Sequence, residues 1–221
     1  MSNYAVMPLN DYVNTCEAIR EKTETTELIK SGEMVDKITD VFNAGKKSEY
    51  DKFWDSIQDY GNRTDYRYAF SRCAEIDFKP KYDFNFGVSF WMFAYAKNVE
   101  FDYVFDLSNA SSINNMFYDC NYLKKIKKII LKADGSQALE QIIYECNELE
   151  EVEFEGVIGG SNMNCATSSK LNHKSLMSII NTLKDFSGTT TTRTLTLHKN
   201  AKARLSESEI AVATQKGWSV A

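Results

Sequence analysis

Apolar residues in the first 60 positions recur at the three- and four-residue spacing of amphipathic helices. One such stretch spans residues 10–22, a second begins near Ser31, and a third covers residues 50–60 and stops at Gly61. Helical stripes of this kind usually face a hydrophobic core. The pattern predicts a helical region over residues 1–63, whose stripes need either the rest of the chain or another subunit as a partner. The stripe residues are Met34, Ile38, Val41, Phe42, Phe53, Trp54 and Ile57.

Beyond this region the pattern changes to short helical and β-like runs that repeat. The segments NMFYDCNYLKKI, from Asn115, and QIIYECNELEEV, from Gln141, share their apolar and Tyr-acid-Cys-Asn positions. A weaker copy precedes them, and a degraded copy runs from His173 to Leu197. Periods of roughly 20 to 30 residues with one short helix and one short strand are typical of solenoids. We therefore predict an α/β solenoid over residues 64–200.

The repeat also predicts which side chains stack, because one unit cannot bury its apolar side alone. The expected pairs in adjacent layers are Cys120 with Cys146, Leu123 with Leu149, and Ile126 with Val152. In the weaker copy, Phe93, Ala96 and Val99 take the places of Phe117, Cys120 and Leu123. The cysteines are expected to fill narrow buried slots rather than to bind metal.

Charged residues recur with opposite sign at the same offset. The expected pairs on neighbouring strands are Lys124 with Glu150, Lys125 with Glu151, and Lys127 with Glu153. Exposed pairs across strands add little stability, so we expect them mainly to fix the register. The rival interpretation, a basic strand that binds an acidic partner, is weaker because the acidic residues are already in the chain.

The last 21 residues, 201–221, have the pattern of a cap. Ser206 with Glu209 forms a capping-box signature, Gly217 marks a helix stop, and Trp218 and Val220 alternate as in a short strand. A solenoid needs such a terminator to cover its last apolar layer.

Composition excludes several classes of function. Hydrophobic residues make up 43% of the 221, and the net charge is −5 with no basic tail, so nucleic acid is not an expected partner. No run has the length of a membrane span and no signal-peptide pattern is present, so we expect synthesis in a cytoplasm. The five cysteines are widely spaced without a CxxC pair, which argues against a disulfide framework.

No residue is assigned a catalytic, metal-binding or cofactor-binding role. The chain has no P-loop, HExxH, nucleophile-elbow or dinucleotide-binding motif. His173 and His198 lie in different units and are expected to flank a helix and to close a strand. Cys165 is the one loop-like thiol by pattern. We therefore expect a protein that is not an enzyme and needs no cofactor.

Aromatic residues give the one indication of a binding surface. The stretch 81–107 is unusually rich in Phe, Tyr and Trp. The favoured interpretation is a thick packed junction between the helical region and the repeats. The alternative is a partly exposed patch for a protein or glycan partner.

Two resemblances add to this reading. The units over residues 66–200 resemble the BspA-type leucine-rich repeats of bacteria and their phages, and the segment LSESEIAVATQKGWSVA resembles the ending of such repeats. The segment MPLNDYVNTCEAIREKTETTELIKSGEMVDKI, residues 7–38, is similar to a segment of tail-associated proteins of phages and prophages of Gram-positive bacteria. Together they imply a short leucine-rich-repeat-like solenoid of phage or prophage origin.

The resemblances imply two possible functions, both non-enzymatic. The first is a protein-interaction module of the phage particle, a tail- or baseplate-associated structural or adhesion protein that binds other tail subunits or a cell-surface glycan. The alternative is an intracellular phage-encoded factor that binds and inhibits a host protein, for example a defence system. Both would be made in the bacterial host cytoplasm, and the first would become virion-associated. Homo-oligomers are expected if the N-terminal stripes stay uncovered.

Overall fold

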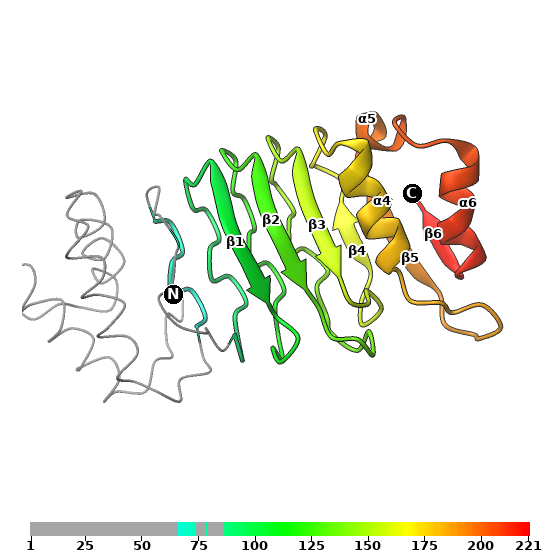
Figure 1. The fold of residues 1–221 in the computed structure, drawn as a ribbon, viewed down its shortest axis with the longest axis horizontal. Coiled ribbons are helices and arrows are strands. Elements are labelled where there is room, and N and C mark those ends of the chain that lie inside the picture. Colours follow the sequence, from blue (N-terminus) through cyan, green and yellow to red (C-terminus); the bar gives the residue numbers. More distant parts are fainter. Residues whose placement is uncertain (1–65, 74–77, 79–85) are drawn as a thin grey trace, which may run out of the picture.

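The computed structural model describes residues 66–73, 78 and 86–221 (Figure 1). The predicted helical region over residues 1–63 lies outside this part of the chain. The described residues form a mixed α/β fold with two parallel three-stranded sheets, ordered β1-β2-β3 and β4-β5-β6. The elements are β1 (Glu100–Asp106), β2 (Lys125–Ile130), β3 (Glu151–Glu155), β4 (Met163–Cys165), α4 (His173–Thr182), β5 (Arg193–Leu197), α5 (Lys199–Lys202), α6 (Glu207–Gln215) and β6 (Trp218–Val220).

The first sheet places equivalent residues of successive units side by side. Ile126 pairs with Val152 and Lys125 pairs with Glu151, as the 26-residue offset predicted. The register then shifts, because two residues separate Ile126 from Ile129 whereas one separates Val152 from Phe154. The extra residue is a β-bulge in β2, and it moves every later side chain of that strand by one position relative to β3.

Across the core from this sheet, the units contain consecutive turns instead of the short helices that the pattern predicted. The N–H of Ala94 donates within its unit to Trp91, 3.3 Å away, whereas the N–H of Phe93 donates to Met116 of the next unit, 2.8 Å away. Trp91 and Tyr95 adopt φ of 60° and 63°. A left-handed residue at every fourth position prevents a helix from continuing, and alternate N–H groups become free to join the neighbouring unit.

The apolar core forms columns between these two sides. Phe93 stacks on Phe70 at a ring-centroid distance of 5.3 Å and on Phe117 at 5.4 Å. Leu123 and Leu149 are fully buried, as predicted. Val99 departs from the prediction, since 40% of it is exposed.

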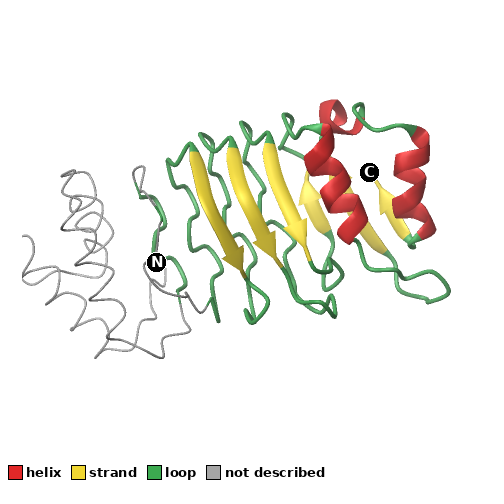
Figure 2. Ribbon diagram, viewed as in Figure 1, coloured by secondary structure: helices red, strands yellow, loops and turns green. Residues whose placement is uncertain are grey.

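In residues 163–220, helices lie on the side of the core where β1, β2 and β3 lie in the earlier units, and strands lie on the side of the turns. Helix α4 packs against β3, where a fourth strand of the first sheet would lie, while β4 continues the row of turns through a bond from Asn164 N–H to the Glu140 carbonyl (2.8 Å) (Figure 2). The hydroxyls of Ser175 and Ser178 accept the N–H groups of Val152 and Phe154, at 2.9 and 2.7 Å. These two serines replace a neighbouring strand as hydrogen-bond partners of β3.

The predicted C-terminal elements are present. Ser206 and Glu209 form a complete capping box at the start of α6, Gly217 follows the helix at φ 81°, and β6 begins at Trp218. Trp218 is buried, and its indole N–H donates to the Lys184 carbonyl over 2.9 Å. Strand β5 lies between β4 and β6, so β6 is the outer strand of this sheet.

Candidate functional site

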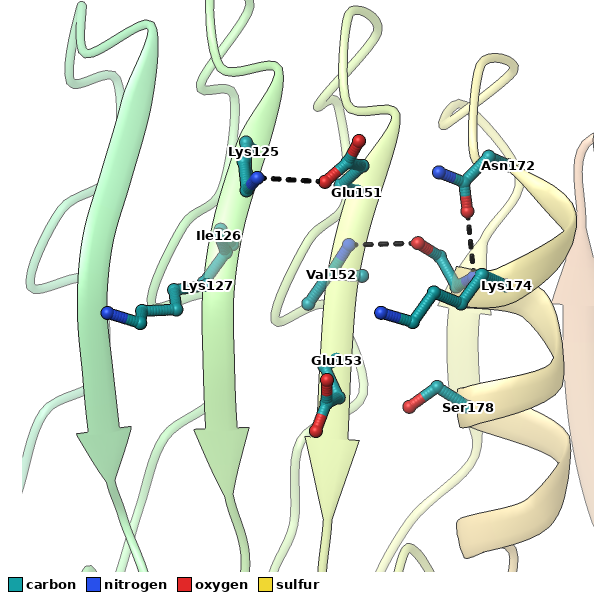
Figure 3. A pocket seen from close by; sticks show the side chains of 10 residues that line it. Lys125, Ile126, Lys127, Glu151, Val152, Glu153, Asn172, Lys174 and Ser178 are labelled. Atoms are coloured by element: carbon teal, nitrogen blue, oxygen red, sulfur yellow. Dashed lines mark hydrogen bonds and ion pairs between the residues drawn. The ribbon is translucent and has the colours of Figure 1, made fainter.

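One candidate site is a shallow groove of about 190 Å³ between β2, β3 and α4 (Figure 3). Ile126 and Val152 provide its apolar lining, and the side chain of Lys174 extends from α4 toward β3. Ser175 lies against the edge of β3, where its hydroxyl also donates to the Glu150 carbonyl at 3.2 Å. The groove marks the place where the helix replaces a strand.

Most charges around this groove already have partners in the chain. Lys125 contacts the Glu151 carboxylate at 3.0 Å, and this contact raises the pKa of Lys125. Lys127 pairs with Asp102 on β1, at 3.0 Å. These pairs join three neighbouring strands, which favours a role in strand register over the binding of a charged ligand.

The predicted pair of Lys127 with Glu153 is wrong, because the bulge in β2 brings Lys128 beside Glu153 instead, at 2.8 Å. Lys124 and Glu150 are joined through their backbones, with Glu150 N–H donating to the Lys124 carbonyl at 2.9 Å.

The other candidate site lies on the opposite side of the core, on the consecutive turns of residues 66–72, 89–96, 113–120 and 139–146. We call this surface the turn face. It carries a row of half-buried aromatic side chains: Tyr68, Trp91, Tyr95, Tyr118 and Tyr144. Ring-centroid distances along the row are 6.1 Å from Tyr68 to Trp91, 4.9 Å from Trp91 to Tyr118, and 5.8 Å from Tyr118 to Tyr144. The row therefore crosses four successive units without a break.

Electrostatics near the middle of the row favour a neutral phenol. Desolvation raises the pKa of Tyr118, and the nearby Tyr95 and Glu145 raise it further. Tyr118 therefore keeps its proton well above neutral pH and can act as a hydrogen-bond donor toward a partner.

The sequence prediction located only part of this surface. In the stretch 81–107, Phe93 and Phe101 are buried in the core, while Trp91 and Tyr95 remain half-buried on the turn face. The predicted junction with the helical region lies outside the described residues. The continuation of the row through Tyr118 and Tyr144 was missed. The signal was the repeated Tyr-acid pair that begins at Tyr118 and at Tyr144, since it marks the aromatic row as well as the repeat.

Four residues of the turn face occupy one equivalent backbone position in successive units. They are Arg72, Tyr95, Asp119 and Glu145, with φ of 62°, 63°, 56° and 60°. The N–H of Tyr95 donates to Tyr118 of the next unit at 2.8 Å, and that of Asp119 donates to Tyr144 at 2.9 Å. Non-glycine residues in this conformation are strained and tend to gather at binding surfaces. We call these four residues the left-handed column.

The cysteines of the repeat are structural. The thiol of Cys120 donates to the Phe93 carbonyl at 3.1 Å, and that of Cys146 donates to the Phe117 carbonyl at 3.0 Å. Burial raises the pKa of Cys120 well above its usual value, and raises that of Cys165 to about 12. The prediction that Cys165 lies in a loop is wrong. Cys165 is the last residue of β4 and is fully buried. None of these three thiols is an available nucleophile.

The two histidines have the flanking roles that were predicted. His173 begins α4 and contacts the Glu209 carboxylate of α6 at 2.7 Å. His198 follows β5 directly and accepts the Asn200 N–H at 3.1 Å, which caps α5.

Neither a metal centre nor a known relative indicates a further site in the described part of the chain. Within residues 66–73, 78 and 86–221, no group of three or more His, Cys, Asp or Glu side chains is arranged to hold a metal ion. Among the helices of the same residues, none has both the length and the apolar character of a membrane span. No family model, curated protein or solved structure matches the chain.

Proposed function

We propose that this chain is a non-enzymatic protein-interaction module of phage or prophage origin, associated with the tail or baseplate of the particle. The observation that carries the proposal is the aromatic row of the turn face. Tyrosine and tryptophan are enriched at protein interfaces because they offer a large apolar area with a polar edge. Trp91, Tyr118 and Tyr144 are half-buried side chains of these types in three successive units.

We further infer that the units over residues 86–155 are leucine-rich-repeat-like coils of a short solenoid. The parallel pairing of β1, β2 and β3 supports this, as do the bonds between successive turns, such as Phe117 N–H to the Ile142 carbonyl at 2.9 Å. In a solenoid each coil displays equivalent positions in a line, so a repeated surface residue becomes an extended binding surface. The aromatic row is a surface of that form.

Incorporation into phage particles tests the proposal. Particles would be purified from cells that express the wild-type chain, the Tyr118→Ala variant, or the Tyr122→Ala variant, and analysed by quantitative mass spectrometry. Tyr122 is the matched control, since it is 59% exposed and lies outside the row. We expect wild type and Tyr122→Ala in particles, and a loss of at least several-fold for Tyr118→Ala.

Absence of all three chains from the particles would contradict the tail-associated function. In that case, capture of a host protein by the wild-type chain but not by Tyr118→Ala would support the intracellular inhibitor instead. If neither particles nor host proteins retained the chain, the interaction function itself would be wrong.

A further inference from the structure

The turn face has a charge order that runs in one direction along the repeats. In the left-handed column, the first residue is the cationic Arg72, the second is Tyr95, and the third and fourth are the acidic Asp119 and Glu145. The guanidinium of Arg72 lies 5.3 Å from the centre of the Tyr95 ring, and Asp119 and Glu145 lie near Tyr118. The aromatic row thus has a cationic end and an acidic end.

A second line of residues shows the same order. Five positions before each member of the left-handed column stand Arg67, Phe90, Asn114 and Glu140. Arg67 lies 6.0 Å from the Phe90 ring centre, and the Glu140 N–H donates to the Asn114 side chain at 3.1 Å, so neighbouring members contact each other. Both lines therefore run from arginine through an aromatic residue to an acidic residue.

The opposite ends cannot neutralise each other inside one chain. Arg72 and Glu145 are separated by the two units that carry Tyr95 and Asp119, and Glu145 forms no ion pair within the described residues. The surface of β1, β2 and β3, which we call the strand face, differs because Lys125 pairs there with Glu151 of the adjacent strand. A second molecule whose charges run in the reverse order would pair both Arg72 and Glu145.

We propose that this molecule is a second copy of the chain, bound antiparallel through the turn face. A two-fold axis lying in that face, between the units of Tyr95 and Asp119, reverses the order of the units and keeps each line opposite itself. Arg72 of each copy then faces Glu145 of the other, and Tyr95 faces Asp119. This inference deepens the proposed function by naming the partner of the turn face, and it rests on that face being an interaction surface.

The dimer should be weak. Neighbouring units lie about 4.8 Å apart, so four units extend over roughly 15–20 Å, and the contact falls at the small end of specific interfaces. We expect self-association at concentrations of about tens to hundreds of micromolar. Charge complementarity then contributes more to orientation and specificity than to affinity.

Sedimentation equilibrium of charge-reversed variants tests the proposal. The full chain would be measured up to about 0.5 mM, a range set by the small interface, as wild type, R72E, E145R, and an equimolar mixture of the two variants. Each variant alone places like charges together at both symmetric contacts, and we expect its association to weaken at least tenfold. In the mixture, the two substituted positions face each other with opposite charges, and the native Arg72 and Glu145 remain paired. The mixture should therefore associate like the wild type.

The control is K127E, which reverses a charge on the strand face and should leave self-association unchanged. Circular dichroism of each variant would establish that it is folded. A mixture that associates no better than its components would overturn the antiparallel arrangement, and so would a wild-type chain that stays monomeric. Binding of a soluble cell-wall glycan by the monomer, lost in Tyr118→Ala, would replace the second copy with a glycan. Particle incorporation does not depend on these outcomes, so the proposed function can stand if the dimer fails.

Discussion

In residues 86–155 the strands lie on one side of the core and the turns on the other, whereas in residues 163–220 helices α4 and α6 occupy the first side and strands β4, β5 and β6 the second (Figure 2). The core continues through both halves as one buried cluster. The comparison shows that successive units can stack on each other even when the element on each side changes. Stacking requires a continuous apolar core and a hydrogen-bond partner for each buried backbone polar group.

The change of element also limits the first sheet. An exposed strand edge would present unpaired N–H and C=O groups to other chains. In the described residues, α4 covers the edge of β3 and supplies the hydroxyls of Ser175 and Ser178 as hydrogen-bond partners. On the other side, the second sheet continues outward to β6. Helix α4 therefore ends the first sheet, whereas the row of turns continues into β4, the first strand of the second sheet.

The largest expected effect comes from removing a core side chain of the repeated half. Leu149 is fully buried, and Leu149→Ala should lower the free energy of unfolding by about 2–5 kcal/mol through lost transfer energy and a residual cavity. Urea unfolding monitored by tryptophan fluorescence and circular dichroism measures this difference. Val99→Ala is the matched control, because 40% of Val99 is exposed where the repeat places a leucine. Equal losses for the two variants would contradict the predicted difference in burial.

A second prediction concerns the junction of the two halves. Ser175→Ala leaves the buried N–H of Val152 without a partner, which should cost about 1–3 kcal/mol. Ser112→Ala is the control, since that half-buried hydroxyl makes no hydrogen bond in the described part of the chain. The same unfolding measurement applies, and amide hydrogen exchange at Val152 should accelerate in Ser175→Ala alone. Unchanged exchange there would show that the serine is not the partner of this N–H.

The fold of the last 16 residues, 206–221, was largely predictable because its signals are local. A capping box, a glycine stop and an alternating apolar pair each occupy a few consecutive residues, so Ser206, Gly217 and Trp218 could be assigned without knowing what they pack against. The stacking of Ile126 with Val152 was predictable for a different reason. Two segments with the same apolar spacing bury the same side chains when they are stacked.

The turns of the repeated half were not predictable in the same way. Apolar spacing at Phe93, Phe117 and Ile143 suits a short helix as well as consecutive turns, and the left-handed residues between them are large side chains rather than glycine. The bonds that select the turns are made to the neighbouring unit, which a local pattern does not contain. The aromatic row was missed for the same reason, since its rings meet only after stacking.

The third prediction tests the strain in those turns. Glu145 has φ 60°, a conformation that disfavours any side chain with a Cβ atom. Glu145→Gly should therefore be more stable than Glu145→Ala by about 0.5–1 kcal/mol, after allowing for the greater freedom of glycine in the unfolded chain. Both variants lose the same carboxylate, so the difference between their free energies of unfolding reports the effect of the backbone conformation at position 145. Measurements at low micromolar concentration would keep the proposed dimer dissociated.

The control for this pair lies in the same unit. Glu140 is exposed and is not among the residues with positive φ, so Glu140→Gly should be less stable than Glu140→Ala. The same order of stability at both positions would show that Glu145 does not adopt a left-handed conformation.

The smallest expected effect tests the register of β2 and β3. The hydrogen bond from Lys128 lowers the pKa of Glu153, whereas the uniform 26-residue offset would assign that role to Lys127. A lowered pKa in the folded state means that the pair contributes stability above pH 4.5, the ordinary value for this carboxyl. That contribution disappears as the pH falls through the lowered folded value. Carboxyl NMR titrations of K128Q and K127Q compare the two candidates directly. We expect the pKa of Glu153 to rise in K128Q and to change little in K127Q, because the bulge directs Lys127 toward Asp102 instead. A rise in the pKa of Glu153 in K127Q alone would show that the 26-residue offset holds along both strands and that β2 has no bulge.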